Sequence, residues 1–97
     1  MATANIVYTE VPQGTHPMQG EGLIVETNQR FYFRHRGTKA SLAISKTNEP
    51  AYNQASLNCA AFYSDEGVHS DNPFIELPAE RVNALVLDWV NLYLSGS

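Results

Sequence analysis

Apolar and polar residues alternate along most of the chain, and this pattern predicts a β-sheet followed by one helix. A half-buried strand repeats apolar side chains at every second position, whereas an amphipathic helix repeats them every three or four residues. The period-two segments are NIVYTEV (5–11), LIVET (23–27), RFYFRHR (30–36), ASLAISK (40–46), ASLNCAAFY (55–63) and a short FIEL (74–77). The Pro- and Gly-rich segment 12–22 predicts a mobile loop. We expect a single α+β domain over residues 1–97, an antiparallel sheet of five to six strands with one C-terminal α-helix.

The segment RFYFRHRGTK (30–39) predicts a β-hairpin with two different faces. Gly37 and Thr38 suit a two-residue turn, which fixes the pairing register of the two strands. On one face this register sets Arg30 against Ser45, Tyr32 against Ala43 and Arg34 against Ser41, with Arg36 beside Lys39. On the other face it sets Phe31 against Ile44 and Phe33 against Leu42, with His35 nearby. The second face predicts core, and the first predicts an open surface on which long cationic side chains stand beside small ones.

The turn that precedes this hairpin decides how the strand before it is oriented. A three-residue turn at 27–29 places Leu23 and Val25 on the core side, with Ile24 and Glu26 on the cationic side. Glu26 then lies where it can pair with Arg30. An exposed pair of this kind contributes only about 0–1 kcal/mol, too little to keep the arginine from a phosphate.

The segment from Pro78 to Leu94 predicts a helix. Pro78 suits a first helical turn, and Gly96 suits the position just past the end. Its apolar stripe consists of Val82, Leu85, Val86, Trp89, Val90 and Tyr93. Further apolar residues lie outside this stripe, more than one contact with a sheet requires. We therefore expect a homodimer through the helix, with an interface of Leu87, Trp89, Leu92 and Leu94.

Charge is divided unevenly along the chain. The net charge is −4, yet residues 30–46 contain five cations and no acid, while the remainder contains ten acids and Arg81. Such a protein repels phosphate over most of its surface and can accept it in one place. With one cysteine, no intramolecular disulfide forms, and no apolar run is long enough to span a membrane. We expect a soluble, cytoplasmic protein.

The basic and aromatic face of the hairpin favours binding of single-stranded DNA or RNA. Unpaired bases stack on aromatic rings and phosphates need cations alongside, whereas the helix is too apolar to read a duplex. Tyr32 is the expected stacking platform, and the expected phosphate contacts are Arg30, Arg34, Arg36, Lys39 and Lys46. Two alternatives stay open: a solvated strand face whose charges prevent aggregation, and a protein-interaction module, an inhibitor or adaptor.

No pattern in the sequence predicts catalysis, a metal or a cofactor. His69, Ser70 and Asp71 are the residue types of a hydrolase triad, but consecutive loop residues seldom point at one another productively. The three histidines lack the spacing of zinc ligands. His35 and Cys59 are expected in the core, and we expect no enzyme activity.

The order of strands ending in NPFIELPAERVNALVLDWVNLYL (72–94) resembles that of small single-stranded-DNA-binding transcription coactivators of the positive-cofactor type, and of Whirly-like proteins. The resemblance spans Arg30 to Leu94. It implies dimers formed through the terminal helix, a curved sheet that binds unpaired strands, a role in transcription or replication, and a protein partner such as an RNA polymerase. Size and composition also suit a small protein of a bacterial virus, which implies the host cytoplasm.

Overall fold

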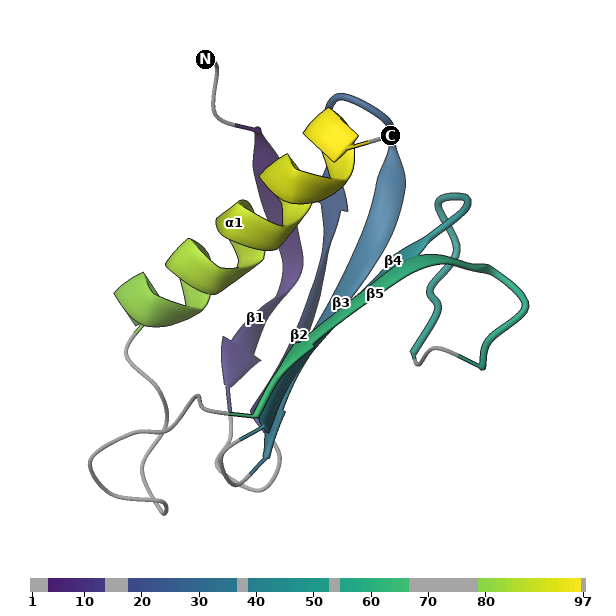
Figure 1. The fold of residues 1–97 in the computed structure, drawn as a ribbon. Coiled ribbons are helices and arrows are strands. Elements are labelled where there is room, and N and C mark those ends of the chain that lie inside the picture. The colour runs from purple at the N-terminus through teal and green to yellow at the C-terminus, as the bar shows by residue number, and fades with distance from the viewer. Residues whose placement is uncertain (1–3, 14–17, 37–38, 53–54, 67–78, 97) are drawn as a thin grey trace.

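In the part of the chain that the structure describes, five antiparallel strands and one helix form two layers. The computed structural model describes residues 4–13, 18–36, 39–52, 55–66 and 79–96. Their elements are β1 (Ile6–Gln13), β2 (Met18–Ile24), β3 (Gln29–Arg36), β4 (Lys39–Ser45), β5 (Cys59–Asp65) and α1 (Ala79–Gly96). The strands are hydrogen-bonded in chain order, β1-β2-β3-β4-β5, and α1 crosses one face of the sheet (Figure 1). The predicted α+β arrangement is confirmed; the predicted turn at 37–38 and strand at 74–77 lie outside the described residues.

β2 lies earlier in the chain than predicted. Residues 18–22 were expected in a mobile loop, yet they form most of β2 and pair with both β1 and β3. A methyl group on Gly20 would meet the Pro12 nitrogen at 2.6 Å, and one on Gly22 would meet Phe31 Cζ at 2.5 Å. The two glycines that signal a loop are therefore strand residues where other parts of the chain approach closely.

The turn between β2 and β3 reverses the predicted orientation of β2. It spans residues 25–28, and Asn28 adopts a left-handed φ of 58° while its N–H donates to the Ile24 carbonyl at 2.8 Å. The turn begins two residues earlier than expected and is one residue longer, so Leu23 pairs with Arg30 and not with Phe33. A register shift by an odd number of residues moves each strand side chain to the other face. Ile24 is consequently fully buried in the core, and Val25 is exposed. The predicted placement of Leu23 and Val25 on the core side is wrong.

The register of the β3–β4 hairpin is the one that the sequence predicts. Tyr32 pairs with Ala43, Arg34 with Ser41 and Arg36 with Lys39. The prediction fails at the far end, because the backbone N–H of Arg30 donates to the Thr47 carbonyl and to Ser45 Oγ. Ser45 is fully buried, and its hydroxyl also donates to the Arg30 carbonyl, so it belongs to the interior and not to an open surface.

α1 covers the apolar face of the sheet and closes the core. Val82, Val86 and Val90 recur at every fourth position and are buried, as the predicted stripe requires. Their partners in the sheet are Phe31, Phe33, Leu42 and Ile44. Two hydrogen bonds add to this packing, from the Ala4 N–H to Asn91 Oδ1 (2.8 Å) and from Gln29 Nε2 to the Tyr93 hydroxyl (2.9 Å). Among the described residues, no helix has the length and apolarity to cross a membrane.

Candidate nucleic-acid interface

The face of the sheet turned away from α1, called the open face below, carries the cationic side chains of the hairpin. Successive side chains of a strand point to opposite faces of the sheet. A strand residue that lies between two core residues in the sequence therefore points to the open face. β3 and β4 contribute the residues predicted for the binding surface, and β5 adds Phe62, which pairs with Ala43. From β2, the register adds Gln19 beside Arg34 and Glu21 beside Tyr32.

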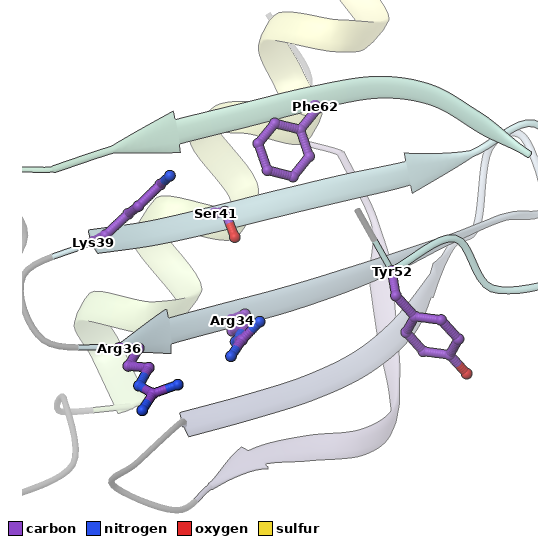
Figure 2. A pocket seen from close by; sticks show the side chains of 6 residues that line it. All are labelled: Arg34, Arg36, Lys39, Ser41, Tyr52 and Phe62. Atoms are coloured by element: carbon purple, nitrogen blue, oxygen red, sulfur yellow. The ribbon is translucent and has the colours of Figure 1, made fainter. Parts of the chain in front are cut away.

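Three cations and two aromatic rings meet in one hollow on the open face. We call it the cationic hollow; it has a volume of about 300 Å³ and is lined by Arg34, Arg36, Lys39, Ser41, Tyr52 and Phe62. Figure 2 shows Phe62 and Tyr52 at two sides of the hollow, with the charged groups of the cations around the remaining edge. Guanidinium groups suit phosphate because they offer several N–H donors in a fixed plane. The hollow thus combines phosphate donors with apolar ring surfaces that a base can stack on.

Tyr32 lies at the border of this hollow and is less open than predicted. Its hydroxyl donates to Gln19 Oε1 at 2.6 Å, and its ring meets that of Tyr52 edge to face, with centroids 5.1 Å apart at 83°. Burial raises the pKa of Tyr32; Arg34 opposes this shift and Glu21 adds to it. Tyr52, 52% exposed, offers freer ring surface than Tyr32 does, and Phe62 is half-buried like Tyr32.

The segment between β4 and β5 folds back over part of the open face. Tyr52 belongs to this segment, and its neighbour Ala51 is only 2% exposed. Ala43, which lies between Tyr32 and Phe62, is 1% exposed. The prediction of an open surface of small side chains beside Tyr32 is therefore wrong. The accessible part of the open face lies toward Arg34, Arg36 and Lys39.

The other two predicted phosphate contacts lie apart from the cationic hollow. Arg30 is held in place, because its Nε donates to the Asn48 carbonyl at 2.8 Å and its Nη1 to Thr9 Oγ1 at 3.2 Å. Lys46 follows the opposite end of β4 from Lys39, about 23 Å away at a rise of roughly 3.3 Å per residue. The structure thus brings together three of the five predicted cations.

The expected contact between Glu26 and Arg30 is replaced by another one. The Glu26 carboxylate accepts the backbone N–H of Asn5 at 2.9 and 3.1 Å, which fastens the start of β1 to the β2–β3 turn. The reason is again the longer turn, which directs Glu26 toward β1.

A second hollow of opposite charge adjoins the cationic one. This acidic hollow has a volume of about 260 Å³ and is lined by Glu10, Gln19, Gly20, Glu21, Tyr32 and Tyr52. Tyr52 lines both hollows, so the ring pair of Tyr32 and Tyr52 separates them. A nucleic-acid strand would be attracted on one side of this pair and repelled on the other.

The helix residues predicted for a dimer interface divide into two groups. Trp89 and Leu94 pack against the core of their own chain, and the Trp89 ring stacks on Tyr63 with centroids 6.4 Å apart. Leu87 is half-buried, and Leu92 is 56% exposed. Two of the four residues thus pack within their own chain, and a helix-mediated dimer stays a prediction.

The residues considered for catalysis or metal binding do not form a cluster in the described part of the chain. His35 is buried at 6% exposure, as expected. Cys59 is half-buried, and its thiol donates a hydrogen bond to the Ala61 carbonyl at 3.3 Å. Residues 4–13, 18–36, 39–52, 55–66 and 79–96 contain no group of three or more His, Cys, Asp and Glu side chains placed to hold a metal. His16 and the segment 69–71 lie outside the described residues.

Comparison with known proteins adds no relative: no family model, curated protein or solved structure matches the chain. The resemblance to single-stranded-DNA-binding coactivators stays a prediction.

Proposed function

We propose that this protein binds single-stranded nucleic acid, without catalysis, through the cationic hollow. The observation that carries the proposal is the meeting of Arg34, Arg36 and Lys39 with the rings of Tyr52 and Phe62. Cations supply affinity for the phosphate backbone, and rings supply stacking surface that only an unpaired base can reach.

The shape of the surface favours a short contact with the strand. The acidic hollow repels phosphate on the side of β1 and β2, so a bound strand stays over β3, β4 and β5. A hollow of about 300 Å³ with three cations contacts only a short stretch of the strand, and the affinity falls as salt rises in proportion to these few contacts.

The test compares one labelled oligonucleotide as a single strand and as a duplex, by fluorescence anisotropy at low salt. We expect the single strand to bind more tightly, because stacked bases in a duplex cannot reach Phe62. Lys39→Ala should weaken binding, whereas Lys46→Ala, the same change at the other end of β4, should not. Equal affinity for both forms, or equal effects of the two lysine variants, contradicts the proposal.

A protein-interaction module is the second candidate function. The adjoining acidic hollow favours it, because a protein surface can offer both signs of charge, whereas a polynucleotide offers phosphate only. Absence of binding to any oligonucleotide, together with a stably folded protein, supports this candidate over the first.

A further inference from the structure

The open face is divided into two halves of opposite charge. Arg34, Arg36 and Lys39 lie over β3 and β4, and Glu10 and Glu21 lie over β1 and β2. The ring pair of Tyr32 and Tyr52 stands between them. The open faces of two copies are therefore complementary in charge when the acidic half of one lies against the cationic half of the other.

We infer that a second copy of this chain docks on the open face, with the acidic half of each copy against the cationic half of the other. A two-fold axis in the plane of the interface, passing beside the Tyr32–Tyr52 pair, exchanges the two halves. Contacts in such a dimer occur twice, because the same patch is used on both copies. Each copy then places carboxylates on the guanidinium groups of the other, the pairing that gives the strongest charge-assisted hydrogen bonds.

The apolar side chains of the open face fit the same arrangement. Val7 pairs with Leu23 on this side of the sheet and is 54% exposed, and Tyr52 is 52% exposed. Phe62 is half-buried at the edge of the cationic hollow. Aromatic and aliphatic groups of this kind supply the water-excluding centre of an interface, around which charged pairs set the orientation.

A second copy fits this surface better than an unrelated acidic or basic partner does. A partner of one charge sign would gain contacts on one half of the face and lose them on the other. The helix layer offers less for association, since Trp89 and Leu94 are partly buried against the core of their own chain. The inference does not rest on the proposed nucleic-acid binding, although both use the cationic hollow and therefore compete for it.

The test uses two charge-reversal variants and light scattering after size exclusion at low salt, in the tens of micromolar. The wild type should be a dimer that dissociates as salt rises. Glu21→Arg makes the face largely basic and Arg34→Glu makes it more acidic, so each variant alone should dimerise about tenfold more weakly or worse. An equimolar mixture of the two should restore the dimer, because the reversed side chains are again opposite in charge across the interface.

Control variants separate a contact on the open face from a general effect of net charge. Asp88→Arg makes the same change of charge as Glu21→Arg, but at an exposed position of α1, and should leave the dimer intact. If either face variant fails to fold by circular dichroism, Glu10→Arg and Lys39→Glu form an equivalent pair. A monomeric wild type at low salt, a mixture that does not associate, or dissociation by Asp88→Arg in place of the face variants overturns the inference.

Discussion

The salt dependence of oligonucleotide binding should report the number of cations in the hollow. Three cations line it, and each phosphate contact on a single strand contributes about 0.7 to the slope of log affinity against log salt. The wild type should therefore show a slope of magnitude about 2. Between about 50 and about 200 mM salt, this slope corresponds to a roughly 18-fold loss of affinity.

Removing one of these cations should lower the slope by a calculable amount. Arg36 is exposed, ends β3 and lines the hollow, so Arg36→Ala removes a contact without touching the core. Its slope should fall to about 1.4, and the same change of salt should then weaken binding only about sevenfold. The assay is fluorescence anisotropy with a short labelled single strand, repeated across the salt series.

The matched control is Arg81→Ala, which removes an exposed arginine from α1, on the far side of the sheet. This variant carries the same change in net charge as Arg36→Ala, so it separates a local contact from the field of the whole protein. If both variants lower the slope equally, or if the wild-type slope is near zero, the cationic hollow does not contact phosphate.

Two further predictions concern stability and are checked by urea denaturation. Phe33→Ala should cost about 3–5 kcal/mol because the ring is fully buried, whereas Tyr32→Ala loses mainly a ring pair worth about 0.5–1.5 kcal/mol; the reverse order would mean that the two faces are assigned backwards. Gly22→Ala should cost about 1–3 kcal/mol, because the added methyl group would meet Phe31 Cζ at 2.5 Å. Gly96→Ala is its control, since nothing lies within 4 Å of the added group, and a wild-type midpoint for Gly22→Ala would show that β1 and β3 do not approach it closely.

The parts of the fold that follow from local patterns could be predicted from the sequence. α1 follows from its apolar stripe, and its observed bounds of Ala79–Gly96 differ from the predicted ones by one residue at the start and two at the end. The β3–β4 register is the one that the predicted two-residue turn requires, because such a turn leaves a single way to pair the strands. Sequence reasoning succeeds here because each element contains its own determinants.

The errors arise where distant segments decide the local structure. Gly20 and Gly22 indicate a loop by themselves, and only the approach of Pro12 and Phe31 explains why they belong to a strand. The length of the β2–β3 turn depends on Asn28 in a left-handed conformation, which asparagine tolerates better than most residues but does not require. Asparagine at position 28 is therefore a sequence signal for this turn, and the predicted turn at 27–29 does not use it.

The three cations of the candidate site could be predicted from the sequence, whereas its two aromatic residues, Tyr52 and Phe62, were not predicted. The spacing of Arg34 and Arg36, and the turn that places Lys39 beside them, are all local. Tyr52 and Phe62 come from the segment after β4 and from β5, and their positions depend on how that segment folds back. The alternation of β5 places Phe62 on the side opposite Cys59 and Ala61, but no local pattern shows that Phe62 and Tyr52 line the same hollow.

The position of α1 after all five strands has a consequence for synthesis on the ribosome. Each strand pairs with its neighbour in sequence, so the hairpins can form as the chain emerges. The apolar face of Phe31, Phe33, Leu42 and Ile44 is nevertheless covered by α1, which is synthesised after it, and the bond from Ala4 to Asn91 joins residues 87 positions apart. At about 5–20 residues per second, translation from Ser45 to Gly96 takes roughly three to ten seconds. During that interval the nascent sheet exposes an apolar surface, and such transiently exposed surfaces are prone to aggregation.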